Sequence, residues 1–245
     1  MSKETKKWWE FSSEDYQKIC KIPIDIHYGP GSPNEKNLKL MGKLKGKKIL
    51  ELGCGGAQCG IAMAKQGAKV TGIDISEKQL KFAKNLAKKN NVNITFYKGD
   101  IINLKKVKSN SYDIVFSAWA LQYVSNLIKC FKEVNRILRK EGMFVFSFGH
   151  RLHEIMDPKT KKIIKSYFDT GKYTKKEKGH LFVMYTRKID EVFNSLIKAD
   201  FIVERIIEPD SRKNYPYDPW KSLWNYNKMK KLIPLTIIFK ARKLR

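Results

Sequence analysis

The chain has 245 residues, of which 42% are hydrophobic and 30% charged, a composition typical of a globular protein. This excludes a disordered or collagen-like chain, and the length suffices for one α/β domain. No apolar run approaches the roughly 20 residues of a membrane-spanning helix, and the first residues lack the apolar core of a secretion signal. We therefore expect a cytoplasmic protein with no membrane span.

The net charge of +26 is the strongest compositional signal. Of the 50 basic residues only eight are arginine, although RNA-reading surfaces usually depend on arginine. Two interpretations stay open, a lysine-rich proteome and a polyanionic partner such as tRNA or an anionic membrane surface. The lysines are spread along the whole chain, which favours the first. The four cysteines are too scattered for a disulfide framework or a zinc site, so we expect reduced thiols and no metal.

Residues 1–45 are predicted to form an N-terminal cap segment. A helix could begin within 15–19, a loop rich in Gly and Pro covers 28–33, and a short helix could follow at 34–41. Trp8 and Trp9 suit either a lid or an interface.

From residue 47 onward, strands alternate with amphipathic helices. Ser76 and Gln79 form a capping box at the start of one helix. Such alternation indicates βαβ units and a parallel sheet. Strands are predicted at 47–52, 68–74, 91–97, 112–117 and 143–148, and helices at 57–66, 76–87 and 127–138.

The alternation breaks after residue 148. Residues 151–185, rich in lysine with aromatic interruptions, are predicted to be a lid insert within a domain that spans 46–245. A helix at 189–199, a strand at 201–208, a polar stretch through 224 and a last strand at 234–240 follow.

Three carboxylates lie at predicted strand ends around one glycine-rich turn. Glu51 precedes the turn Gly53–Gly56, and Asp74 and Asp100 end the next two strands. The carboxyl ends of parallel strands form the ligand-binding edge of such a sheet. The dinucleotide fingerprint fails at its third glycine, and no P-loop motif is present. A ligand with ribose hydroxyls, a positive charge and no phosphate is expected, and S-adenosylmethionine meets these demands.

The block Ile49-Leu-Glu51-Leu-Gly53-Cys-Gly55-Gly resembles the class I S-adenosylmethionine-dependent methyltransferases, together with Asp74, Gly99-Asp100 and Tyr112-Asp-Ile-Val. The resemblance covers roughly residues 45–150 and is strongest to the ubiquinone/menaquinone-biosynthesis type of domain. It implies an α/β, Rossmann-like, seven-stranded, mostly parallel sheet of order 3-2-1-4-5-7-6, with helices on both faces. His27-Tyr-Gly-Pro resembles a segment of some uncharacterised microbial methyltransferases.

The resemblance also implies roles in binding the cofactor, which leaves as S-adenosyl-L-homocysteine. Asp74 would accept from the ribose hydroxyls, Asp100 from the adenine amine, and Glu51 would orient the amino group. Cys54 would fill the turn, and Tyr28 would close over the cofactor. The full predicted set is Tyr28, Glu51, Gly53, Cys54, Gly55, Asp74, Ile75, Gln79, Gly99, Asp100, Ile101, Ser117 and Ala118.

The methyl acceptor is predicted to bind after the fourth strand, and the motifs of base-amine and cytosine-C5 methyltransferases are missing there. His150 and Tyr185 are candidate general bases. A small-molecule acceptor is expected, while an RNA methyltransferase and a non-catalytic partner subunit remain alternatives. The predicted acceptor-binding residues are Trp119, Gln122, Tyr123, His150 and Phe182.

Overall fold

The computed structural model describes residues 1–213, 215, 220 and 229–244. Residue 224, the end of the predicted polar stretch, lies outside the described residues. Within the described part of the chain, no helix is long and apolar enough to cross a membrane.

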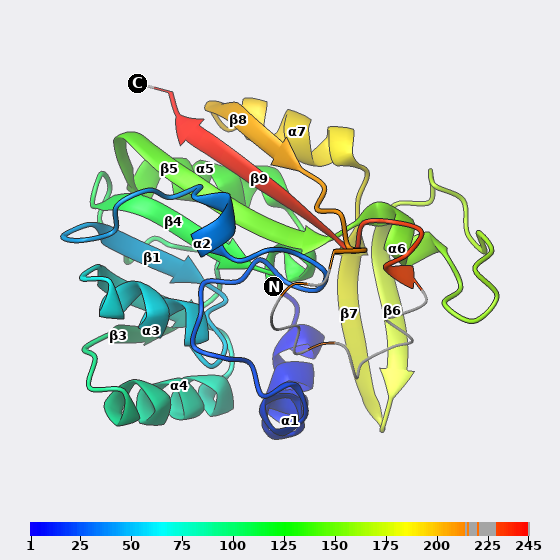
Figure 1. The fold of residues 1–245 in the computed structure, drawn as a ribbon, viewed down its shortest axis with the longest axis horizontal. Coiled ribbons are helices and arrows are strands. Elements are labelled where there is room, and N and C mark those ends of the chain that lie inside the picture. The colour runs from blue at the N-terminus through cyan, green and yellow to red at the C-terminus, as the bar shows by residue number, and fades with distance from the viewer. Residues whose placement is uncertain (214, 216–219, 221–228, 245) are drawn as a thin grey trace.

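A seven-stranded sheet forms the centre of the molecule (Figure 1), with the order β3-β2-β1-β4-β5-β9-β8. Neighbouring strands from β3 to β5 pair in parallel, and β9 pairs antiparallel with both β5 and β8. This confirms the predicted order, because β8 and β9 are the sixth and seventh strands of the sheet. The strands are β1 Lys48–Leu52, β2 Lys69–Asp74, β3 Thr95–Lys98, β4 Tyr112–Ala118, β5 Leu138–Gly149, β8 Phe201–Ile207 and β9 Thr236–Lys243.

Helices cover both faces of the sheet, as predicted. On one face, α5 (Leu127–Ile137) and α7 (Ile189–Ile197) bury apolar side chains against a core that includes Phe144 and Phe239. On the other face, α3 (Gln58–Lys65) and α4 (Glu77–Lys89) pack over a second core. Because both faces are covered, the central strands are buried along most of their length rather than alternating between buried and exposed residues.

The N-terminal helix is longer than the sequence predicts. α1 spans Lys3–Cys20, and the hydroxyl of its N-cap Ser2 accepts a hydrogen bond from the Thr5 amide at 3.1 Å. The predicted start within 15–19 is wrong, because the buried face of α1 contains Ser13 and Gln17 rather than an apolar stripe. Hydrophobic periodicity therefore does not reveal its first turns. The short helix predicted at 34–41 is α2, Glu35–Leu38.

Residues 151–185 contain α6 (Arg151–Ile155) and most of an antiparallel hairpin of β6 (Gly171–Glu177) and β7 (His180–Thr186). The hairpin forms a second, two-stranded sheet. Figure 1 shows the hairpin and α1 outside the main sheet, and α1 packs against both β7 and α4. The division into cap, domain and lid insert stays a prediction.

Candidate active site

The glycine-rich turn after β1 requires glycine for two reasons. Gly53 and Gly55 have φ angles of +64° and +51°, in the left-handed region that side chains disfavour. A Cβ atom on Gly53 would also lie 2.3 Å from the Cβ of Ala120, which follows β4. The turn thus brings bare backbone against the end of β4.

Two buried carboxylates flank this turn. Glu51 is 4% exposed, and its Oε2 has no hydrogen-bond partner among the described residues. Burial raises the pKa of Glu51 to about 8. Asp74 accepts from the amides of Gly55 and Ser76 at 2.8 and 2.9 Å, and burial raises its pKa as well. One oxygen of the Glu51 carboxyl therefore lacks the partner that a buried polar atom needs.

These groups line a cavity at the carboxyl ends of the parallel strands, here called the cofactor cavity. Most of the predicted cofactor residues contribute to its wall. They are Glu51, Gly53, Cys54, Gly55, Asp74, Ile75, Gln79, Ile101 and Ala118.

Four predicted cofactor residues do not line this cavity as the structure describes it. Tyr28 is fully buried in the second core and donates to Glu35 Oε2 at 2.5 Å, so it does not close over the cavity. Ser117 donates to the Leu52 carbonyl at 2.9 Å, and Gly99 donates its amide to the Asp74 carbonyl at 3.0 Å. Asp100 is paired with the amino group of Met1, which does line the cavity.

Helix α1 covers the cofactor cavity. Gln17 accepts from Gln58 Nε2 at 2.7 Å and donates to Gln79 Oε1 at 2.9 Å, which ties α1 to both α3 and α4. Trp9 and Tyr16 also lie in the wall. With α1 in this position the free volume is about 100 Å³. Ligand pockets usually measure about 300–1,000 Å³, so the cavity under α1 is smaller than a typical ligand site.

Trp119 separates the cofactor cavity from a second one. Its φ angle is +55°, and its indole Nε1 donates to Thr236 Oγ1 at 3.1 Å. The indole lies against Gly29, where a Cβ would lie 2.1 Å from Nε1. A non-glycine residue in this conformation is strained, and such strain concentrates at functional sites. Trp119 is thus held by two segments far apart in sequence, those of Gly29 and Thr236.

The second cavity, here called the acceptor cavity, measures about 430 Å³. Its wall includes Trp119 and Tyr123, which also line the cofactor cavity, so the two cavities adjoin. Tyr123 makes edge-to-face contacts with Trp9 and Phe182, at centroid distances of 5.5 and 5.9 Å. Aromatic side chains from α1, β7 and the 3₁₀ helix η1 (Leu121–Tyr123) therefore form one network.

Of the predicted acceptor residues, Trp119, Gln122, Tyr123 and Phe182 line the acceptor cavity, whereas His150 does not. His150 is 2% exposed, contacts Glu208 Oε1 at 2.6 Å, and its Nδ1 accepts from the Leu152 amide at 3.2 Å. It caps α6 instead of facing a cavity, which corrects its predicted position.

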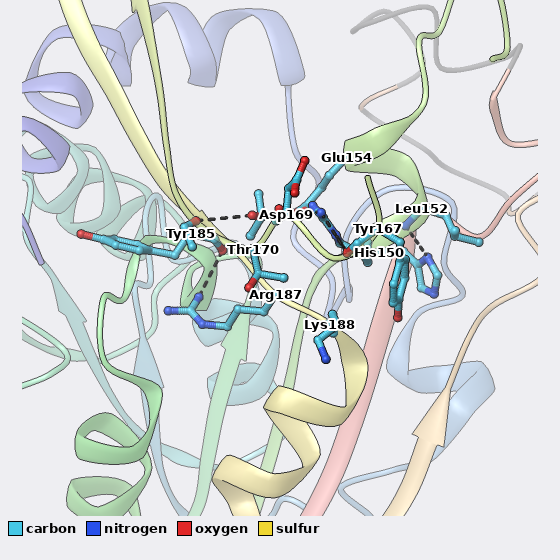
Figure 2. Close-up of polar contacts among 12 residues, drawn as sticks. His150, Leu152, Glu154, Tyr167, Asp169, Thr170, Tyr185, Arg187 and Lys188 are labelled. Carbon is cyan, nitrogen blue, oxygen red and sulfur yellow. Dashed lines mark hydrogen bonds and ion pairs between the residues drawn. The ribbon is translucent and has the colours of Figure 1, made fainter. Parts of the chain in front are cut away.

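Tyr185, the other predicted base, lines neither cavity as described. It borders a small void behind the acceptor cavity, and the Arg187 guanidinium lies 5.5 Å from its ring centroid. Figure 2 shows the rings of His150 and Tyr185 directed away from each other. The structure does not bring the two predicted bases together.

Comparison with known proteins identifies the family. A family model described as a methyltransferase domain matches residues 43–200. An uncharacterized protein of Haemophilus influenzae is 30% identical over 211 residues, covering 80% of this chain and 82% of that protein. The chain belongs to the methyltransferase domain family.

Further similarities agree with this membership. A ubiquinone biosynthesis O-methyltransferase of Coxiella burnetii is 36% identical over 108 residues, which span 44% of this chain and 46% of that protein. The chain thus matches less than half of that O-methyltransferase. A putative S-adenosylmethionine dependent methyltransferase from Listeria monocytogenes matches with a TM-score of 0.70 and 25% identity, over 86% of this chain and 96% of that chain. The fold is that of the class I methyltransferases, as the sequence predicts.

The cavity of this methyltransferase-family chain fits the cofactor that the sequence predicts. The unpartnered Glu51 oxygen matches a positively charged amino group, and the Asp74 carboxylate matches a pair of hydroxyl donors. The bare backbone at Gly53 admits close approach of a ligand. These groups suit S-adenosyl-L-methionine.

Several residues that line the cavities are absent from the predicted cofactor-binding and acceptor-binding sets. Trp9 and Tyr16 line both cavities, and their spacing of seven residues within the 3–20 helix was the available signal. His27 lines the cofactor cavity, and its Nδ1 is buried without a partner in the described part of the chain. Burial lowers the pKa of His27 to about 4, so it is neutral. Glu154 lines the acceptor cavity, and no motif marks it.

Proposed function

We propose that this chain transfers a methyl group from S-adenosyl-L-methionine to a compact, partly apolar small molecule. The observation that carries the proposal is the junction of the two cavities at Trp119 and Tyr123. One cavity has buried carboxylates, and the other has aromatic walls. A methyl donor in the first would meet an acceptor in the second across a short distance.

In this proposal the strand-end residues hold the cofactor. Asp74 accepts from the ribose hydroxyls, and Glu51 orients the amino group. Asp100, which is paired with the Met1 amino group in this structure, accepts from the adenine amine once α1 has moved outward. When bound, the cofactor supplies a methyl group already activated by its sulfonium. The protein mainly supplies proximity and orientation, and it excludes water.

Residues 1–45 and 151–185 act as the cap and the lid of this site. Helix α1 moves outward to admit the cofactor and returns to the position held by Gln17. A cavity of about 430 Å³ suits a compact acceptor better than a folded RNA. The buried acids Glu51 and Asp74 favour an active enzyme over a non-catalytic partner subunit, because a burial cost this large needs a compensating ligand.

Calorimetry with S-adenosylhomocysteine tests this proposal. Asp74→Ala removes charge-assisted hydrogen bonds, so the affinity should fall by roughly 1.5–3 kcal/mol. Asp74→Asn keeps one acceptor oxygen and should lose less. Asp113→Asn serves as a control, because Asp113 pairs with Arg139 at the start of β4, far from the cavity. Unchanged affinity in Asp74→Ala would overturn the cofactor assignment.

A further inference from the structure

A buried carboxylate outside the predicted site faces the acceptor cavity. The side chain of Glu154 is 10% exposed, and its Oε2 accepts from Arg151 Nη1 at 3.3 Å. Its other oxygen, Oε1, lies on the side of Gly149. A methyl group placed on Gly149 would be 3.8 Å from Oε1 and 3.8 Å from Cη2 of Trp119. One oxygen of Glu154 and the ring of Trp119, which lines both cavities, therefore face the same side of Gly149.

Arg151 does not neutralise this carboxylate completely. Most guanidinium contacts of Arg151 go to the backbone carbonyls of Ser166, Tyr167 and Asp169, at 2.7–3.2 Å. Figure 2 draws Tyr167 and Asp169 of this loop together with Glu154. Arg151 thus holds the loop in place, and Glu154 keeps an oxygen for a ligand.

A second acceptor atom lies near Glu154. Gln122 is 8% exposed, and its Oε1 is buried with no hydrogen-bond partner in residues 1–213, 215, 220 and 229–244. Gln122 and Glu154 line both the acceptor cavity and the small void behind it, so they belong to the same end. A buried oxygen without a partner costs stability unless a ligand supplies a donor.

The local charge is opposite to that of the whole chain. The chain carries a net charge of +26, yet the charged residues that line the acceptor cavity are Asp15, Glu154, Glu177, Lys175 and Lys178. Both lysines pair with acids, Lys175 with Glu177 at 3.1 Å and Lys178 with Asp15 at 3.6 Å. Among these five residues, Glu154 is the one with no partner in the wall itself, because its partner Arg151 does not line the cavity.

The remaining wall is aromatic. Trp8 contacts Phe182 edge-to-face at 5.4 Å, and Trp9 contacts Tyr123 at 5.5 Å. Aromatic faces attract cations, and cages of such rings bind ammonium groups. Rings, an amide oxygen and a carboxylate together are complementary to a group that is cationic and rich in donors.

We propose that the methyl acceptor is a primary or secondary amine on a compact apolar group, held by Gln122 and Glu154, with Glu154 as its general base. This inference rests on the proposed function and names its substrate class. The ammonium group donates to Gln122 Oε1 and to the Glu154 carboxylate, while the apolar part packs on Trp8 and Phe182. An anionic acceptor is disfavoured, because its charge would face Glu154.

The chemistry balances with these groups. The Glu154 carboxylate takes one proton from the bound ammonium and becomes a carboxylic acid, which leaves a neutral amine with a lone pair. The amine nitrogen then forms a bond to the methyl carbon, the methyl–sulfur bond breaks, and its electron pair stays on sulfur. The product is a methylated ammonium, and Glu154 releases its proton to solvent after the product leaves.

The environment gives Glu154 a suitable proton affinity. Burial raises its pKa to about 7, while the facing charges of Arg151, Arg187 and Lys165 act in the opposite direction. His153 from the same helix is neutral, because burial lowers its pKa to about 4. A base that titrates near the working pH is the most effective.

Binding of benzylamine and of its neutral isostere benzyl alcohol tests the inference. Quenching of tryptophan fluorescence in the full chain, saturated with S-adenosylhomocysteine, reads the rings of Trp8, Trp9 and Trp119. We expect benzylamine to bind about 10- to 100-fold more tightly than benzyl alcohol, the range for a charged hydrogen bond. Glu154→Gln should remove this preference, and Gln122→Leu should reduce it. In the wild type the amine affinity should fall as the pH drops below about 7, and Glu154→Gln should lose that dependence.

A matched control separates the carboxylate at this position from carboxylates in general. Glu204 also pairs with an arginine, Arg242, but lies on β8 outside the cavity, so Glu204→Gln should keep the preference. Equal binding of the two probes, or an unchanged preference in Glu154→Gln, would overturn the amine assignment. Binding of S-adenosylhomocysteine is measured in the same samples. If the wild-type protein does not bind S-adenosylhomocysteine, the proposed function is overturned instead.

Discussion

The carboxylates of the cofactor cavity come from the ends of β1 and β2, whereas the walls of the acceptor cavity come from α1, η1 and the β6–β7 hairpin. On the cofactor side, Asp74 is positioned by backbone amides of the next few residues and of the glycine turn. On the acceptor side, Tyr123 meets Trp9 and Phe182, which lie more than 50 residues away from it along the chain in each direction.

This difference separates what the fold requires from what the individual protein adds. A parallel sheet brings its strand ends to one edge, so the cofactor groups follow from the sheet itself. The acceptor walls depend on side-chain packing between elements outside the sheet. We therefore expect substitutions on the two sides to have separable effects.

The largest effect is expected for Gly53→Ala. The new Cβ would lie 2.3 Å from the Ala120 Cβ, and the φ angle of Gly53 is +64°. Left-handed backbone costs about 1–2 kcal/mol and overpacking about 1–3 kcal/mol, so the free energy of unfolding should fall by roughly 2–5 kcal/mol. Urea denaturation measures this loss.

Gly42→Ala is the matched control for the clash. Gly42 has nearly the same φ angle, +67°, but nothing lies within 4 Å of an added Cβ in the described structure. In Gly42→Ala the free energy of unfolding should fall only by the cost of the left-handed backbone, about 1–2 kcal/mol. Equal losses in the two variants would mean that the turn does not depend on contact with the end of β4.

The same comparison explains what the sequence could predict. The glycine turn and the acids Glu51 and Asp74 are adjacent to their strands, so a local motif identifies them. The order of the sheet follows from the resemblance of that motif and from the alternation of elements. Nearly all of the fold around the cofactor cavity was predictable for this reason.

Contacts between distant segments were not predictable. The buried face of α1 contains Ser13 and Gln17, whose hydrogen bonds to α4 cannot be read from periodicity. His150 follows β5 as predicted, but its ring caps α6 because the Leu152 amide needs an acceptor there. Glu154 becomes a site candidate only when the fold brings it beside Gly149 and Trp119.

The next effect concerns helix α1, which lines the acceptor cavity and covers the cofactor cavity. Trp9→Ala removes edge-to-face contacts with Tyr16 and Tyr123, at 5.4 and 5.5 Å. Each such pair contributes about 0.5–1.5 kcal/mol, so amide hydrogen exchange in α1 should become about 5- to 100-fold faster. The strands of the main sheet should exchange at unchanged rates.

Tyr97→Ala is a suitable control, because Tyr97 is 55% exposed on β3 and lines neither of the two cavities. It should leave the exchange of α1 unchanged. Faster exchange throughout the sheet in Trp9→Ala would show that α1 and the sheet unfold as one unit, and the proposed separation of the two sides would be lost.

A smaller effect is expected in the protonation of Glu51 in the cofactor cavity. Burial raises the pKa of Glu51 from its ordinary value of 4.5 to about 8, so the carboxyl is mostly protonated at pH 7. A positively charged amino group beside it favours the ionised form and lowers this pKa. Binding of S-adenosylhomocysteine at pH 7 should therefore release up to about one proton.

Calorimetry in two buffers of different ionisation enthalpy measures the released proton. Glu51→Gln cannot ionise and should abolish the release.

The raised pKa of Glu51 also determines how the stability of the protein changes with pH. The native state holds the Glu51 proton between pH 4.5 and about 8, so stability falls as pH rises through this window, and Glu51→Gln should flatten that slope. Proton release that persists in Glu51→Gln would assign it to another group.

The smallest effect is expected in discrimination among RNAs. A net charge of +26 attracts any polyanion, so weak RNA binding at low salt should occur. The lysines are distributed over separate elements such as α4 and β6. The wall of the acceptor cavity also contains the carboxylate of Glu154, which disfavours a phosphate there. Gel shifts should therefore show about the same affinity for tRNA and for unrelated RNA of equal length.

The salt dependence of RNA binding distinguishes non-specific attraction from a specific RNA site. Binding that rests on phosphate neutralisation alone falls steeply with salt, by about 10³–10⁵ between 50 and 200 mM when several phosphates are contacted. Loss of all binding over this range, with no preference among sequences, agrees with an acceptor side built for a small molecule. A tRNA complex that persists in salt and excludes other RNAs would mean that the basic surface forms a specific site. The contrast between the cofactor side and the acceptor side would then change. The acceptor side would extend from the acceptor cavity to the outer face of the cap and the hairpin.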